Sequence, residues 1–179
     1  MTDTAARPQS ITDEFAREWG PRFCAGWNSH DPEQIVKLTT DDVHWEDPFI
    51  YPNGALHGQV ALGEWIASIL RAFGDVEFQV VGQPLIALDR SRLMFEWVGT
   101  SRMTGALDPP GFAPTGGMVE FRGIDTHDFR DDLLAHVWTV TDVAAVAGQI
   151  GAMPPPGSIG EKLGVQVQHL MAKRLRRKG

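Results

Sequence analysis

Val119-Glu120-Phe121-Arg122-Gly123-Ile124-Asp125-Thr126-His127-Asp128-Phe129 is the stretch of sequence that decides the fold. Read with a period of two, one face carries apolar side chains together with Asp125 and His127, and the other face is mainly polar. Alternation over this length predicts a half-buried strand. Two ionisable groups on an otherwise apolar face form either a satisfied pair in the core or the floor of a functional site.

Other segments with a period of two surround this stretch. We expect strands over residues 76–80, 93–99 and 133–141, separated by turn residues at 89–91 and 131–132. The last of these is apolar on both faces, which is typical of a central strand. Residues 43–47 predict a further strand that ends at Pro48, with Val43, Trp45 and Asp47 on one face.

Helical periodicity fills much of the rest of the chain. Apolar residues at steps of four predict a helix over residues 11–27, which Pro21 would kink or divide. Asp31 caps a second, short helix over 32–38, and a third is expected over 59–73. A short helix over 142–150 follows the last strand. The sum is an α+β domain in which a cone-shaped, curved, mixed or antiparallel sheet wraps around N-terminal helices and leaves a pocket.

The domain boundaries follow from composition. With 179 residues the chain suffices for one domain with a proper core. We expect a disordered N-terminus over 1–10, the α+β domain over 11–152, and a proline-rich linker followed by a basic helix over 153–179. The linker is marked by Pro154-Pro155-Pro156-Gly157, and the long segment 104–117 is expected to be a loop or lid.

Charge and hydropathy exclude several classes of protein. The net charge of −7 argues against nucleic acid as the main partner. No apolar run is long enough to cross a membrane, and the first residues lack a secretory segment, so we predict a cytoplasmic protein. The single cysteine, Cys24, excludes an internal disulfide framework.

An ordered set of short segments resembles a known group of proteins. The segments are Trp27-Asn28-Ser29-His30-Asp31-Pro32-Glu33, Asp41 to Pro48, His57-Gly58, Pro114-Thr115-Gly116, Gly123-Ile124-Asp125, and Asp131 through His136-Val137-Trp138 to Asp142. Together they resemble the nuclear transport factor 2-like superfamily, and within it the SnoaL-like group of polyketide cyclases and ketosteroid isomerase-like proteins. The resemblance implies the cone fold, a homodimer and a pocket for cofactor-independent chemistry on a small hydrophobic molecule.

Three templates from the superfamily place candidate residues. On the ketosteroid isomerase template, the resemblance implies that Asp47 is the general base and that Asp125 is the second, protonated acid. The template's Tyr, which donates a hydrogen bond in the oxyanion hole, falls on Phe23, so this donor is missing. The acid of SnoaL-like cyclases falls on Thr139. The Asp-Arg-Asp set of limonene-epoxide hydrolases falls on Gly99, Trp97 and Thr139, so that template does not fit.

These residues suggest an acid–base mechanism. Asp125, on an apolar face, would be neutral and donate to a developing enolate oxygen, and Asp47, beside a loop, would be the ionised base. His127 would orient or share the proton of Asp125. Aromatic side chains would line the pocket and suit a flat, apolar, carbonyl-bearing ligand. They are Phe23, Trp27, Trp45, Trp97, Phe121 and Trp138.

Structural interpretations of the same residues stay open. Asp47 could cap the turn at Pro48, Asp125 could be a satisfied core acid, and His127 could be structural. No phosphate loop, nucleophile serine motif or metal-ligand spacing is present, so we expect no cofactor and no metal.

The alternative function is a non-catalytic small-molecule-binding or assembly module of the same fold. A pocket filled by tryptophans, with Asp125 bound to protein groups, would favour that module. An open pocket of a few hundred cubic ångströms, with Asp125 unpaired at its floor, would favour the enzyme.

Overall fold

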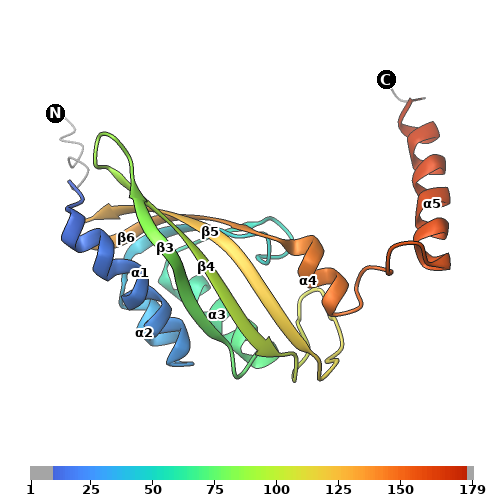
Figure 1. Cartoon of the computed structure of the whole chain (residues 1–179), viewed down its shortest axis with the longest axis horizontal. Helices are drawn as coiled ribbons and strands as arrows, with labels where there is room; N and C mark the ends of the chain where they lie inside the picture. Colours follow the sequence, from blue (N-terminus) through green and yellow to red (C-terminus); the bar gives the residue numbers. More distant parts are fainter. Residues whose placement is uncertain (1–9, 177–179) are drawn as a thin grey trace.

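A curved six-stranded sheet, in the order β2-β1-β6-β5-β4-β3, wraps around the helices α1, α2 and α3 (Figure 1). The computed structural model describes residues 10–176. β1 pairs with β6 in parallel, and every other neighbouring pair in the sheet is antiparallel. The predicted α+β class with a curved mixed sheet around N-terminal helices is confirmed.

The elements have the following bounds. The strands are β1 Thr39–Glu46, β2 Ala55–His57, β3 Glu77–Ile86, β4 Arg92–Arg102, β5 Met118–Arg130 and β6 Leu133–Thr141. The helices are α1 Asp13–Asn28, α2 Pro32–Val36, α3 Gln59–Ala72, α4 Val143–Gln149 and α5 Ile159–Arg176.

The face of β5 that the sequence assigns to the interior is buried along its whole length. Asp125 and His127 share this face with apolar side chains, and both are almost completely inaccessible to solvent. β5 lies between β4 and β6, so both of its edges are paired. Its inner face is covered by helices. The period-two pattern therefore identified the centre of the sheet.

Helix α1 supplies aromatic side chains to the concave side of the sheet. Thr12 caps it by accepting a hydrogen bond from the backbone N–H of Phe15. The helix is continuous through Pro21, which is exposed, so the carbonyl that this proline leaves unpaired can face water. Trp19, Phe23 and Trp27 point into the core from successive turns.

The strand predictions need corrections. β1 begins earlier than expected, at Thr39, and β3 continues past the expected end at residue 80 to Ile86. The expected loop before His57 contains the short strand β2. β2 escaped prediction because three residues are too few to show alternation. Along β6 a register shift opposite Asp128 and Phe129 places Leu134 inside and turns His136 and Trp138 outward.

The C-terminal helix α5 stands apart from the sheet (Figure 1). The hydroxyl of Ser158 caps it by accepting a hydrogen bond from the backbone N–H of Glu161, and no residue of α5 is buried. The segment 104–117 is a loop apart from one bridge between Leu107 and Phe112. Residues 1–9, most of the N-terminus expected to be disordered, lie outside the described residues, as do Arg177 and Lys178 of the basic C-terminal segment. Over residues 10–176 no helix is both long enough and apolar enough to cross a lipid bilayer.

Candidate active site

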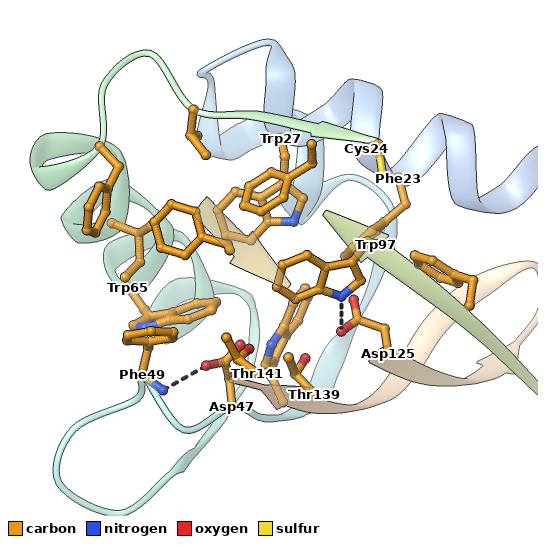
Figure 2. Close-up of a pocket in the computed structure, with 17 residues that line it drawn as sticks. Phe23, Cys24, Trp27, Asp47, Phe49, Trp65, Trp97, Asp125, Thr139 and Thr141 are labelled. Atoms are coloured by element: carbon orange, nitrogen blue, oxygen red, sulfur yellow. Dashed lines mark hydrogen bonds between the residues drawn. The ribbon is translucent and has the colours of Figure 1, made fainter. Parts of the chain in front are cut away.

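The concave face of the sheet, α1, α3 and the loop after β1 enclose a pocket (Figure 2). Its volume is about 70 Å³. Seventeen side chains line it, mostly aromatic, and the polar ones are Cys24, Asp47, Asp125, Thr139 and Thr141. Five of the aromatic residues expected at the pocket do line it, namely Phe23, Trp27, Trp45, Trp97 and Phe121.

Asp47 lies at the wall of this pocket, one residue beyond the end of β1. Its Oδ1 accepts a hydrogen bond of 2.7 Å from the backbone N–H of Phe49, so the carboxyl caps the turn that Pro48 begins. The same side chain is buried among aromatic rings. Burial raises the pKa of Asp47 to about 7, against the lowering effect of the Phe49 N–H, and the charge of Asp125 raises it further.

This result reverses the electrostatic expectation for Asp47. The sequence suggested a carboxylate kept ionised by a polar loop, because Pro, Asn and Gly follow Asp47. The loop instead folds Phe49 and Ile50 back over the site, and both are at least partly buried. Asp47 is therefore the desolvated acid of the pocket.

Asp125 lies on the adjacent wall, between the side chains of Trp97 and His127. Trp97 Nε1 donates a hydrogen bond of 2.9 Å to Asp125 Oδ1. His127 Nε2 lies 3.4 Å from Asp125 Oδ2, in a region where both side chains are buried. Oδ1 of Asp125 is thus hydrogen-bonded, whereas the His127 Nε2 beside Oδ2 has no hydrogen-bond partner among residues 10–176.

Gly123 makes the Trp97 contact possible. Gly123 pairs with Trp97 across β5 and β4, and the indole of Trp97 lies over it toward Asp125. A Cβ at position 123 would lie 2.4 Å from Trp97 Cζ2 and 2.7 Å from the backbone oxygen of Val140. In the segment Gly123-Ile124-Asp125, Gly123 therefore leaves room for the indole of Trp97, and Asp125 accepts the hydrogen bond from its N–H.

His127 lies behind Asp125, outside the pocket lining. Its Nδ1 is 2.8 Å from Trp19 Nε1, and because an indole nitrogen can only donate, Nδ1 accepts this bond. The other ring nitrogen, Nε2, lies 3.4 Å from Asp125 Oδ2 and has no hydrogen-bond partner among residues 10–176. His127 therefore packs beside Asp125 without a hydrogen bond to it, and it has no contact with the pocket through which to exchange a proton with a ligand.

Thr139 occupies the space between the two carboxyl groups. It pairs with Asp125 across β5 and β6, and the neighbouring pair Glu46–Trp138 places Asp47 beside it on the other side. Neighbouring strands lie about 4.8 Å apart, so the backbones of Asp47 and Asp125 are about 10 Å apart with Thr139 midway. Figure 2 shows Asp47, Thr141, Thr139 and Asp125 in succession beneath the tryptophans.

Three buried polar atoms of the pocket residues have no hydrogen-bond partner within residues 10–176: Trp45 Nε1, Trp65 Nε1 and Thr141 Oγ1. A buried donor without a partner costs free energy, so each of these groups is a candidate to bond a ligand or a water molecule in the pocket. Two indole N–H groups and a hydroxyl would suit a carbonyl oxygen.

Trp138 is the predicted ligand contact that the structure places elsewhere. Its side chain is 51% exposed, on the convex face of the sheet. Thr139 and Thr141, its neighbours along β6, point into the pocket in its place. Trp65 of α3 and Thr141 were not predicted, although Trp65 lies one turn before Ile69 and shares its helix face. Thr139 was named only as the position where the cyclase template has its acid.

Other chemistries find little support in the pocket. Burial raises the pKa of the Cys24 thiol to about 12, and the charge of Asp125 adds to the effect, so this thiol is a poor nucleophile. Among residues 10–176, one cluster has ligand atoms close enough to hold a metal ion. It consists of His44, Glu46 and His136 and lies on the opposite face of the sheet from the pocket.

Comparison with known proteins agrees with this fold. The model of the SnoaL-like domain matches residues 21–137, which is more than half of the chain. The chain belongs to the SnoaL-like family. No curated protein gives a significant match to this SnoaL-like chain.

Solved structures of the same fold cover most of the SnoaL-like chain. AclR, a proposed hydroxylase from Streptomyces galilaeus, is 16% identical over 91% of this chain and 98% of its own, with a TM-score of 0.68. A proposed SnoaL-like polyketide cyclase from Jannaschia sp. CCS1 is 20% identical over 76% and 92%, with a TM-score of 0.63. A Catenulispora acidiphila protein with a ketosteroid isomerase-like fold, in complex with trimethylamine, is 17% identical over 75% and 95%, with a TM-score of 0.60. At these identities the likeness establishes the fold, and the site must carry the argument on function.

Proposed function

We propose that this chain is a cofactor-independent acid–base enzyme that isomerises, cyclises or dehydrates a small hydrophobic carbonyl compound. Membership of the SnoaL-like family supports a role of the cyclase or isomerase kind. The observation that carries the proposal is Asp47, a buried carboxyl at the wall of an aromatic pocket.

Asp47 is proposed as the general base. With a pKa of about 7, Asp47 is present in both the protonated and the ionised form near neutral pH. Such a group removes a proton next to a carbonyl and returns it elsewhere more effectively than a carboxyl with an ordinary pKa. In this proposal the loop after β1 removes water from around Asp47, and this desolvation raises the pKa of the base.

The donors to the developing enolate oxygen are proposed to be Thr141 Oγ1 and the indole N–H groups of Trp45 and Trp65. All three are buried without a hydrogen-bond partner among residues 10–176, and they belong to residues that line the same pocket. They would take the place of the Tyr hydroxyl that Phe23 lacks. Donors fixed before reaction stabilise negative charge without reorganisation.

Asp125 takes a positioning role in this proposal. Its Oδ1 accepts the hydrogen bond of Trp97 Nε1, and its Oδ2 lies 3.4 Å from His127 Nε2, so both oxygens are directed at protein groups. The contacts therefore favour Asp125 as the group that holds the Trp97 indole flat in the pocket wall over the role of a proton donor.

The size of the pocket limits the ligand. A volume of about 70 Å³ has room for about five water molecules, well below the space that a drug-sized ligand needs. Phe49 lines the pocket from the loop over 48–54 and is only partly buried. We propose that a substrate ring enters by displacing Phe49 and that the described conformation is closed.

Proton exchange tests the proposal without knowledge of the natural substrate. 2-Tetralone and cyclohex-3-enone would be incubated with the protein in D2O, and loss of the α-proton signals would be followed by NMR. We expect catalysed exchange that Asp47→Asn lowers by about a hundredfold or more. Asp108→Asn, in an exposed loop, is the matched control and should leave the rate unchanged.

The second candidate is a binding or assembly module, and two observations favour it. Asp125 is bound to Trp97, and the pocket is small. Saturable binding of 2-tetralone, seen by tryptophan fluorescence, without catalysed exchange of any ketone in the panel would establish the module and reject the enzyme.

A further inference from the structure

A row of polar side chains crosses the convex face of the sheet, opposite the pocket. His57, His44, His136 and Asp128 are cross-strand neighbours on β2, β1, β6 and β5. The His57 and His44 rings stack with centroids 4.2 Å apart, and the His44 and His136 rings with centroids 4.9 Å apart. The register of four strands therefore brings together three of the six histidines of the chain.

Glu46 completes a compact set with two of these rings. It lies two residues after His44, on the same face of β1. Its Oε1 is 2.8 Å from His136 Nε2, and one ligand atom from each of His44, Glu46 and His136 lies within 4.8 Å of the others. Glu46 and His136 are partly exposed, so an ion can reach them from solvent.

A second carboxylate orients the His136 ring. Asp128 Oδ2 lies 3.3 Å from His136 Nδ1, and Asp128 is itself held by two hydrogen bonds from Arg92, of 2.6 and 2.5 Å. A carboxylate on one ring nitrogen fixes the imidazole tautomer and directs the other nitrogen outward, as it does for many metal-ligating histidines. Here the directed atom is Nε2, the one that faces Glu46.

We propose that His44, Glu46 and His136 bind a divalent first-row transition-metal ion of the zinc class. Imidazole and carboxylate ligands suit such an ion, and its remaining positions would be filled by water. Tetrahedral ligands at about 2.0 Å from zinc lie about 3.3 Å apart, so the stacked rings must turn to converge. All three are surface side chains, and this adjustment leaves the backbone in place.

A metal ion at this site would cross-link β1 and β6, the one parallel pair of strands in the sheet. Sequence spacing could not indicate it, because His44 and His136 are 92 positions apart and meet only through the register of these strands. The proposal is independent of the proposed activity, since the ligands and the pocket lie on opposite faces of the sheet.

Calorimetric titration of ZnCl2 into the chelator-treated full-length protein tests the site. We expect one zinc ion per chain, no binding of Mg²⁺, and a zinc-dependent rise of the melting temperature. His44→Ala and His136→Ala should each weaken zinc binding at least about tenfold, and Asp128→Asn by about tenfold.

His169→Ala is the matched control, since His169 lies exposed on α5. It should leave zinc binding unchanged, and His136→Gln replaces His136→Ala if the latter does not fold. Absence of saturable zinc binding, or zinc binding that survives removal of His44 or His136, would overturn the proposal.

Discussion

Trp97 Nε1 donates a hydrogen bond of 2.9 Å to Asp125 Oδ1, across the space that Gly123 leaves open on the neighbouring strand. The bond joins the aromatic wall of the pocket to the central strand β5. Behind it, Trp19 fixes His127, and His127 faces Asp125, so helix α1 supports the same carboxyl. Asp125 is thereby part of a rigid support, which leaves Asp47 as the less constrained carboxyl of the pocket.

Replacement of Trp97 by Phe should destabilise the fold. The substitution keeps most of the ring but leaves Asp125 Oδ1 buried without its donor, which costs about 1–3 kcal/mol. Urea unfolding measures the change. Trp138→Phe is the matched control because Trp138 is half exposed, and it should stay within about 0.5 kcal/mol of the parent. Equal losses in the two variants would show that the Trp97–Asp125 bond contributes little.

Gly123→Ala should displace the Trp97 indole. The new Cβ would meet Trp97 Cζ2 at 2.4 Å and the backbone oxygen of Val140 at 2.7 Å, and backbone cannot yield cheaply. We expect a loss of about 1–3 kcal/mol in the free energy of unfolding and a changed near-ultraviolet circular dichroism signal. Gly148→Ala, where a Cβ meets nothing within 4 Å, is the control and should be neutral or slightly stabilising. An unchanged stability of Gly123→Ala would contradict the tight approach.

Asp47 should make stability depend on pH. Its pKa rises from an ordinary 3.8 to about 7 on folding, so the folded state binds the proton more tightly. The contribution of Asp47 is fully present below pH 4 and is lost as pH rises toward and through 7. Asp47→Asn, which keeps the acceptor for the Phe49 N–H, should be more stable than the parent at pH 8, by up to about 4 kcal/mol.

Urea unfolding at pH 4 and pH 8 measures this difference. The gap between parent and Asp47→Asn should nearly close at pH 4. A gap of the same size at both values would mean that the carboxyl does not titrate between them.

Removal of residues 158–179 should leave the melting temperature within about 2 °C of the full-length value, because no residue of α5 is buried. Differential scanning calorimetry measures it. The homodimer predicted from the family resemblance can be tested on the same pair by light scattering. We expect the full chain to be dimeric and the truncated chain to associate more weakly, because α5 exposes Ile159, Leu163 and Leu170. A large fall in the melting temperature of the truncated chain would show that α5 packs on the rest of the domain.

The sequence predicted the inner face of β5 in full and most helix bounds to within two residues. It did so where periodicity is long and unambiguous, as over residues 119–129. It failed for Trp138 because β6 is apolar on both faces, and a register shift opposite Asp128 decides which face turns inward.

The polar groups of the site were harder to predict. Thr141 and Thr139 carry no periodic apolar signal, so nothing in the sequence separates a hydroxyl at a pocket wall from one at a sheet edge. The burial of Asp47 depends on how the loop after it folds. Phe49 closes over the carboxyl, and the presence of Pro48 in the sequence does not predict this. The histidine row on the convex face needed the pairing of four strands.

Thr141→Val separates stability from ligand contact at the proposed donor site. Thr141 Oγ1 is buried and lacks a partner among residues 10–176, so the isosteric methyl removes a desolvated hydroxyl without breaking a bond. We expect the free energy of unfolding to stay equal or to rise by up to about 1 kcal/mol. Exchange of 2-tetralone protons should fall by about tenfold or more, because one donor to the enolate oxygen is lost. Urea unfolding and the exchange assay, run on the same preparation, give the two values. A destabilised variant with full exchange activity would show that the Thr141 hydroxyl stabilises the fold and does not donate to the enolate oxygen.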